Sequence, residues 1–159
     1  MKTILTTLFA SCLFVSTCTA QTSYPMIMSL APNSAQIGQT SEHTVKSRYD
    51  LSGTLSVWIS GTGVTAEPIH PELKEGETPK STTSLKIKVT VAPDAMPGVR
   101  EFRLSTVNGA STVGQLVVVR DPVVVEHDKN NSTEEAQLVA LPATICGAIE
   151  KNEDLDFFK

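Results

Sequence analysis

Leu85-Lys86-Ile87-Lys88-Val89-Thr90-Val91 alternates apolar and polar side chains without interruption. A period of two residues is that of a β-strand, in which successive side chains point to opposite faces. We therefore expect a strand here, with its apolar side chains on a buried face and its lysines and threonine on a wet face. The stretch indicates a sheet that covers a core on one side only.

Similar β signals follow this stretch. Glu101–Ser105 places Phe102 and Leu104 inward in a second alternating strand. Asn108-Gly109 comes next and predicts a hairpin turn, because both residues tolerate positive φ. Gln115–Val119 then returns as a more fully buried strand.

Strands are also expected before it, at Leu55–Ile59 and around Val45. Residues 67–84 are rich in Pro, Glu, Lys and Ser and are expected to form a long exposed loop. The chain beyond residue 20 shows no sustained helical period with caps at both ends. Short strands separated by Gly, Pro and Asn turns predict an antiparallel β-sandwich over residues 24–120.

Asp121-Pro122 marks the end of this module, and residues 121–135 are expected to form a polar linker. The β signals then resume, with one strand expected within residues 143–150 and another starting at Asp154. Two strands cannot bury the apolar side chains that this segment carries. Residues 136–159 therefore either dock on the first module or form the truncated start of a second β-sandwich domain.

The beginning of the chain has the features of an export signal. A basic start is followed by an apolar run, and Cys18-Thr19-Ala20 supplies small residues where a signal peptidase cuts. We expect residues 1–20 to be removed by cleavage after Ala20, giving a secreted, periplasmic or cell-surface protein without a membrane segment. In the alternative interpretation Cys18 carries a lipid anchor, for which Thr17 is an unfavourable neighbour. Cleavage leaves Cys146 as the single thiol, and its apolar neighbours predict that it is buried and unreactive.

The charge balance is 13 basic against 17 acidic residues, with no basic cluster that would bind nucleic acid. No short spacing joins His43, His70 and His127 into a zinc site, so all three are expected at the surface. The chain also lacks a Gly-x-Ser-x-Gly elbow. We therefore expect that it is not an enzyme, and that its partners are other domains of the same protein or an extracellular protein or polysaccharide.

Trp58 is the only tryptophan of the chain. A single tryptophan in the middle of a sandwich strand usually belongs to the core, and that is the expectation here. In the alternative, an exposed Trp58 stacks on a sugar ring or on another module. Residues 130–133 also contain two overlapping glycosylation sequons, which matter only in a eukaryotic host.

Four stretches carry a family resemblance: Met28–Pro32, Ile37–Thr40, Val57–Val64 and Val89–Leu104. The last contains an Ala-Pro-Asp-Ala-x-Pro-Gly connection between two apolar strands. Together they resemble immunoglobulin-like modules of the IPT/TIG type, as found in large secreted proteins of planctomycete-type bacteria. The resemblance covers most of residues 25–119 and implies an immunoglobulin-like antiparallel β-sandwich.

The C-terminal part carries a second resemblance, in residues Glu126, Asp128, Asn130, Asn131, Ala136, Leu141, Pro142, Ile145, Gly147, Ile149 and Asp154–Phe158 without Leu155. This set is similar to the opening of a bacterial pre-peptidase C-terminal domain, a β-sandwich jelly roll often attached to secreted peptidases. Only the opening strands of such a domain are matched. The resemblance therefore implies an incomplete second domain.

In some relatives of that domain, the linker and an Asp-x-Asp strand bind calcium together. By position, the resemblance implies a calcium site formed by Glu126, Asp128, Asn130, Asn131, Asp154 and Asp156. Calcium takes roughly six to eight oxygen ligands, which carboxylates, amides and carbonyls supply. The family usually has Glu-Pro-Asn-Asp where this chain has Asp-Lys-Asn-Asn, so one carboxylate is missing. The alternative is a solvated acidic linker in which Asp and Asn form turns.

Two functions are compatible with these features. The first is a non-catalytic structural or interaction module of a secreted or cell-surface protein, as a fragment of a larger multidomain protein. The alternative is an accessory region of a secreted peptidase or other hydrolase whose catalytic domain is absent from these 159 residues. A downstream continuation with further sandwich repeats would favour the first function, and one with a protease domain the second.

Overall fold

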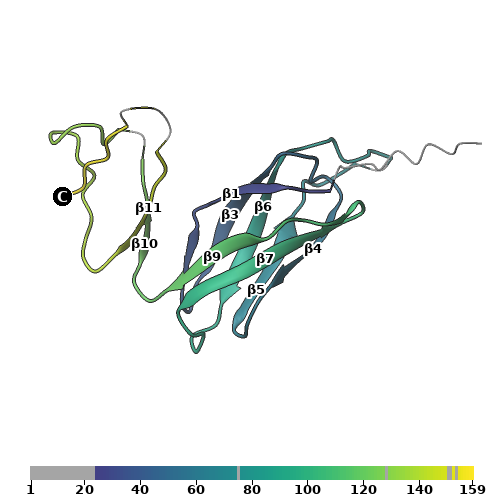
Figure 1. The fold of residues 1–159 in the computed structure, drawn as a ribbon, viewed down its shortest axis with the longest axis horizontal. Coiled ribbons are helices and arrows are strands. Elements are labelled where there is room, and N and C mark those ends of the chain that lie inside the picture. The colour runs from purple at the N-terminus through teal and green to yellow at the C-terminus, as the bar shows by residue number, and fades with distance from the viewer. Residues whose placement is uncertain (1–23, 75, 128, 150–151, 153) are drawn as a thin grey trace, which may run out of the picture.

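The computed structural model describes residues 24–74, 76–127, 129–149, 152 and 154–159, so the expected export signal lies outside the described residues. Every regular element in the described part is a β-strand, and no helix there is long and apolar enough to cross a bilayer. Two sheets form a sandwich, and a two-stranded ribbon follows it toward the C-terminus (Figure 1). The expected all-β class is confirmed.

The two sheets of the sandwich have four and five strands. One has the order β1 (Ile27–Ala31), β3 (Thr40–Ser47), β6 (Ser84–Val91) and β5 (Val64–Ile69), and all its pairs are antiparallel. The other has the order β2 (Ser34–Gln36), β9 (Gly114–Val119), β7 (Gly98–Thr106) and β4 (Thr54–Ile59), with β8 (Gly109–Ala110) beside β7. Strands β1, β3, β4, β5, β6, β7 and β9 occupy the places of strands A to G in an immunoglobulin sandwich. The immunoglobulin-like fold is therefore confirmed.

The core lies between the inner faces of these sheets. Strand β6 shows the predicted alternation without a break, because each of its apolar side chains is buried and each polar one exposed. Phe102 and Leu104 of β7 face it from the other sheet, as expected. Burying a side chain of this size contributes about 1.5–3 kcal/mol. The ring of Phe102 occupies the space that a side chain at Gly114 would need, so only glycine fits opposite it in β9.

Two expected boundaries shift, and strand β5 was not among the expected strands. Strand β3 spans Thr40–Ser47 and pairs along its length with β6, so it is longer and more central than the strand expected around Val45. Strand β5 includes Glu67-Pro68-Ile69, which the sequence assigned to a loop. An edge strand tolerates proline, because one side of it needs no N–H donor. The loop therefore covers residues 70–83.

The hairpin after β7 turns one residue earlier than expected. Strand β7 continues to Thr106, which pairs with Gly109, so Val107-Asn108 form the turn. Gly109 has a φ of 115° and begins β8 instead of ending the turn. The side-chain hydroxyl of Thr106 donates to the carbonyl of Gly109 at 3.0 Å and stabilises this register.

His43 corrects the expectation that all three histidines lie at the surface. It is 1% exposed and points between the sheets, whereas His70 and His127 are exposed. Its Nδ1 lies 2.7 Å from the carbonyl oxygen of Pro32 and its Nε2 lies 2.8 Å from Oγ of Ser41. A carbonyl only accepts, so Nδ1 donates to Pro32, and neutral Nε2 accepts from Ser41. The ring thus supports the chain where it passes from β1 in one sheet to β2 in the other.

The C-terminal segment, residues 121–159, has little regular structure in its described part. Strands β10 (Val123–Val125) and β11 (Thr144–Cys146) form a parallel ribbon, and Cys146 is buried as predicted. The strand expected from Asp154 is reduced to a single bridge between Gln137 and Phe158. Phe157, the residue before Phe158, donates its backbone N–H to the carbonyl of Asn130 at 2.8 Å. That carbonyl belongs to a loop, so the bond is not part of a sheet. The jelly-roll assignment of this segment stays a prediction.

Candidate functional sites

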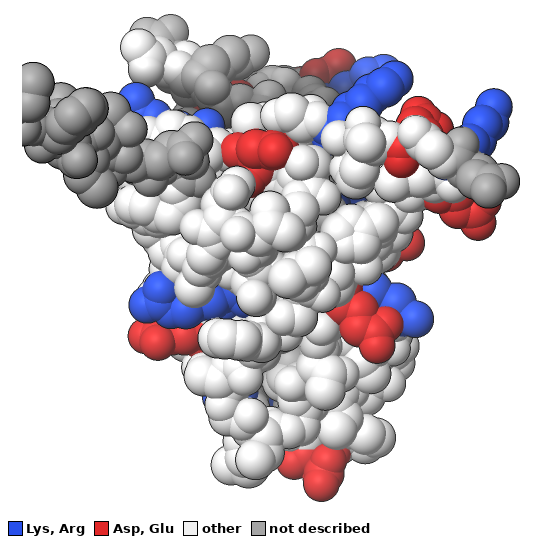
Figure 2. Space-filling model, turned by 90° about the vertical axis from the view of Figure 1, so that its right-hand side faces the viewer, with Lys and Arg blue, Asp and Glu red and all other residues white. Residues whose placement is uncertain are grey.

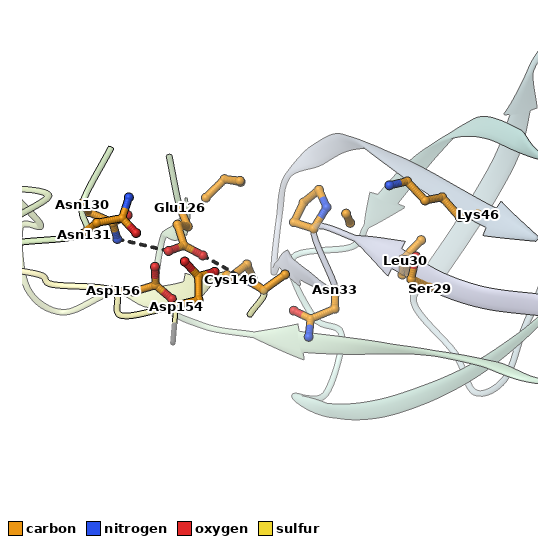
Figure 3. A pocket seen from close by; sticks show the side chains of 15 residues that line it. Ser29, Leu30, Asn33, Lys46, Glu126, Asn130, Asn131, Cys146, Asp154 and Asp156 are labelled. Atoms are coloured by element: carbon orange, nitrogen blue, oxygen red, sulfur yellow. Dashed lines mark hydrogen bonds between the residues drawn. The ribbon is translucent and has the colours of Figure 1, made fainter. Parts of the chain in front are cut away.

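The residues expected to bind calcium come together beside the sandwich. Glu126 directly follows β10, and the residues of the next loop and of the chain end gather around it (Figure 3). One cavity of about 390 Å³ is lined by Glu126, Asn130, Asn131, Asp154 and Asp156. The sandwich contributes the opposite wall, through Ser29–Asn33 and Lys46. Asp128, the remaining expected ligand, lies outside the described residues.

Glu126 is at the centre of this acidic pocket. Its Oε1 accepts a hydrogen bond from Nδ2 of Asn130 at 3.1 Å, and its Oε2 accepts one from the backbone N–H of Ala148 at 3.0 Å. Hydrogen bonding with the side chain of Asp156, and then with Asn130, holds the pKa of Glu126 below its usual range. Asn130 is itself buried. The contacts of Glu126 thus join the linker, β11 and the chain end.

Gly147 lets this carboxylate approach the backbone. A side chain at residue 147 would overlap Oε2 of Glu126, so only glycine leaves room for the hydrogen bond to Ala148. The carboxylates of Asp154 and Asp156 lie beside that of Glu126 (Figure 3). The pocket therefore combines a backbone donor with acidic oxygens.

The donor set of the pocket is chemically suited to a hard cation. Carboxylate and amide oxygens are the ligands that calcium prefers, and three carboxylates and three amides line the cavity, one of the amides being Asn33 on the sandwich wall. Within the described residues, no three His, Cys, Asp or Glu side chains are grouped closely enough to hold a metal ion by themselves. Amide oxygens, backbone carbonyls or water would have to complete the coordination of an ion here.

Trp58 defines a second candidate site, on the outer face of the sheet that contains β4, β7 and β9. It is 61% exposed, which corrects the expectation that it belongs to the core. Its neighbour Val57 is buried, and successive side chains of a strand point to opposite faces. Trp58 therefore points outward, at the position directly opposite Arg103 of β7.

Polar side chains surround the indole on this face. Arg103 donates from Nη1 to the carbonyl of Ser111 at 2.7 Å, which fixes its guanidinium. Glu101, two residues before Arg103 on β7, lies opposite Gln115 of β9. The side chains of Arg103, Glu101 and Gln115 are all exposed. One aromatic and three polar side chains from three adjacent strands thus share this outer face. We call this surface the Trp58 face, and it consists of Trp58, Arg103, Glu101 and Gln115.

The end of the sandwich opposite the C-terminal segment differs from the acidic pocket in its surface charge. Its surface is mainly uncharged, and acidic and basic side chains lie mostly around its margins (Figure 2). No large area of one charge is visible on this end. It offers no electrostatic pattern comparable to the acidic pocket.

No family model and no curated protein matches the chain. Among solved structures, it is similar to SGBP-B of the mixed-linkage glucan utilization locus of Bacteroides ovatus, solved in complex with a mixed-linkage heptasaccharide. The identity is 13%, the TM-score is 0.44, and the match covers 74% of this chain and 27% of that one. The chain thus spans about a quarter of that protein. So distant a similarity indicates neither a family nor a ligand for this chain.

Both sites contain features that the sequence did not reveal. The N–H of Ala148 and the open space at Gly147 belong to the backbone, and no residue pattern indicates them. The wall that Ser29–Asn33 contributes to the acidic pocket depends on the tertiary arrangement. The sequence did show that Val57 and Trp58 cannot both face the core, but not which of the two faces outward.

Proposed function

We propose that the chain is a non-catalytic structural and interaction module of an exported protein, and that calcium in the acidic pocket holds its C-terminal segment in place. The immunoglobulin-like sandwich serves as the rigid part of this module. The segment after it is the adjustable part, whose order depends on the cation.

One observation carries this proposal: the described members of the expected ligand set line a single cavity although they come from two stretches of the C-terminal segment. Glu126 lies at the exit from β10, and Asp154 and Asp156 lie near residue 159. Carboxylates that line one cavity repel one another unless a cation, a proton or a hydrogen-bond donor offsets their charge. A bound calcium would therefore tie the chain end to the linker.

Calcium binding can be measured by titrating calcium chloride into EDTA-treated protein in a calorimeter. We expect the wild-type chain to bind, and an Asp154→Asn/Asp156→Asn variant to bind at least about ten-fold more weakly because two charged ligands are lost. Limited proteolysis should show, in addition, that calcium protects residues 121–159 in the wild type only.

The matched control is Glu134→Gln/Glu135→Gln, which removes the same charge from exposed positions of the same segment. This control should bind calcium as the wild type does. The proposal is wrong if the wild type binds no calcium, or if the two double variants lose binding equally, since that would indicate a diffuse charge effect.

A further inference from the structure

The Trp58 face has the composition of a site for sugar rings. A pyranose ring presents an apolar C–H surface to an aromatic side chain and polar hydroxyl groups at its edge. Trp58 offers the aromatic surface from edge strand β4, with Arg103 of the neighbouring strand β7 directly opposite. An indole buries a large apolar area while losing little conformational freedom.

The hydroxyl edge of such a ring needs donors and acceptors at short range. Adjacent strands are roughly 4.8 Å apart, so the residues opposite Trp58 lie within reach of a ring that stacks on it. Arg103 supplies donors, Glu101 supplies acceptors and Gln115 supplies both. On the same face of the sheet, the pair next to Trp58 and Arg103 is Ser56 of β4 and Ser105 of β7, and both side chains are partly exposed.

Two properties of this face favour ligand binding and distinguish it from an ordinary exposed surface. The bond from Arg103 to the Ser111 carbonyl holds the guanidinium in place before any ligand arrives, which lowers the entropy lost on binding. The polar side chains also come from β7 and β9, each of which is hydrogen-bonded to a strand on both sides, and edge strand β4 pairs with β7 along its length. The face is therefore preorganised.

The charge of the face distinguishes between classes of ligand. Arg103 and Glu101 carry opposite charges and lie two residues apart on one strand, so the face is close to neutral. An acidic polysaccharide would be attracted by Arg103 and repelled by Glu101. A protein partner would need a larger apolar centre than one indole. The other exposed large apolar side chains within β4 and β7 are Leu55 and Val99, which lie toward opposite ends of the two strands.

We propose that the Trp58 face binds an uncharged polysaccharide, with Trp58 stacking on one sugar ring, Arg103 bonding to the hydroxyl groups of that ring, and Glu101 and Gln115 bonding to the next ring of the same chain. This site is separate from the acidic pocket and does not depend on calcium. Binding of sugar and binding of calcium can therefore succeed or fail independently.

The test is native affinity electrophoresis of the chain in gels that contain a soluble β-glucan, galactomannan or xylan, with polygalacturonate as the acidic counterpart. We expect retardation by at least one neutral polysaccharide and none by polygalacturonate. Trp58→Ala should weaken the retardation at least about ten-fold. Trp58→Phe should retain part of it, because a smaller ring still stacks.

Two matched controls separate the site from general surface effects. Leu138→Ala removes an exposed apolar side chain elsewhere, and Arg120→Gln removes an exposed arginine that is not on this face. Both should migrate as the wild type does, whereas Arg103→Gln should bind several-fold more weakly. The proposal is overturned if no neutral polysaccharide retards the chain, if Trp58→Ala leaves the retardation unchanged, or if only polygalacturonate is bound.

Discussion

The sandwich and the C-terminal segment are both built from β-strands, yet they are held together by different forces. Every buried apolar side chain of the described chain, apart from Cys146, belongs to the sandwich. The C-terminal segment instead exposes Leu138, Leu141 and Ile149 and buries the amide of Asn130. Its order rests on hydrogen bonds around Glu126.

This difference shows what alternation alone achieves. Where apolar side chains recur every second residue on several long strands, two faces can close on each other and exclude water. Strands β10 and β11 have three residues each, and a pair of that size cannot enclose a core. Polar contacts then have a larger share in fixing the structure.

The largest effect on the free energy of unfolding is expected when one aromatic ring of the sandwich is removed, and the comparison is with one aromatic ring of the C-terminal segment. Phe102→Ala should lower the free energy of unfolding by about 3–5 kcal/mol, because it empties the centre of the sandwich. Phe158→Ala, at a partly exposed position of the C-terminal segment, should change it by less than half as much. Urea denaturation followed by circular dichroism measures both. Equal losses would mean that the two regions unfold as one unit.

His43 is expected to have the next largest effect. His43→Leu keeps an apolar body but leaves the Pro32 carbonyl and the Ser41 hydroxyl without their partner. We expect a loss of about 1–3 kcal/mol in the free energy of unfolding. A variant as stable as the wild type would show that the crossover from β1 to β2 does not need this ring.

The same histidine gives the sandwich a pH dependence that differs from that of the C-terminal segment. Burial lowers the pKa of His43 below 6.5 although the Pro32 carbonyl opposes this, so the unfolded chain takes up the proton first. The contribution of His43 to stability should be complete above pH 6.5, decline as the pH falls from there to the folded pKa, and level off below it. The pKa of Glu126 lies below 4.5, so its contribution should be complete above pH 4.5 and be lost as the pH falls from there through the lower folded pKa. Unfolding curves of the wild type and of His43→Leu across this range, in calcium-free buffer, test the order.

Asp50 offers a smaller effect at the end of the sandwich. Its Oδ1 accepts from the backbone N–H of Ser52 at 3.0 Å and of Thr82 at 2.8 Å, which ties the β3–β4 turn to the start of β6. Desolvation acts to raise the pKa of Asp50, but bonds from Ser52 and Thr82 outweigh it and lower the pKa below 3.8. Asp50→Ala should cost about 1–2 kcal/mol at neutral pH, measured by thermal unfolding. As the pH falls through this lowered pKa, the difference from the wild type should shrink.

The smallest effect is expected for the exposed ion pair between Lys86 and Glu42. Their N–O distance is 3.2 Å, but both side chains are more than half exposed. Lys86→Ala should change the free energy of unfolding by less than about 0.5 kcal/mol. A larger loss would indicate that the outer face of β6 contributes to stability as well as its buried face.

The sequence predicted the fold better than it predicted the orientation of single side chains. The alternation in β6 defined its inner face because polar and apolar residues are strictly separated there. In β3, Val45 is the only large apolar side chain, so the pattern understated the strand, although His43 shares the face of Val45. In β4, both alternating sets contain apolar residues, and only the packing decides that Val57 faces inward.

The candidate sites divide in the same way. Glu126, Asp154 and Asp156 were expected to lie together because the resemblance to the pre-peptidase C-terminal domain implies it, and all three line one cavity. The sequence did not predict the backbone N–H donor of Ala148 or the wall that the sandwich contributes to the pocket. Both arise from the arrangement of distant segments. The Trp58 face was noted only as an alternative, because the register between β4 and β7 decides its composition.

The outward position of the single tryptophan also affects how this protein can be observed. An indole that is 61% exposed already experiences water in the native state. Its emission maximum should therefore shift little when the sandwich unfolds, and tryptophan fluorescence would report poorly on the loss of the core. The same property gives the chain a natural optical probe of its outer face, which should respond to whatever covers Trp58 and remain almost silent to events inside.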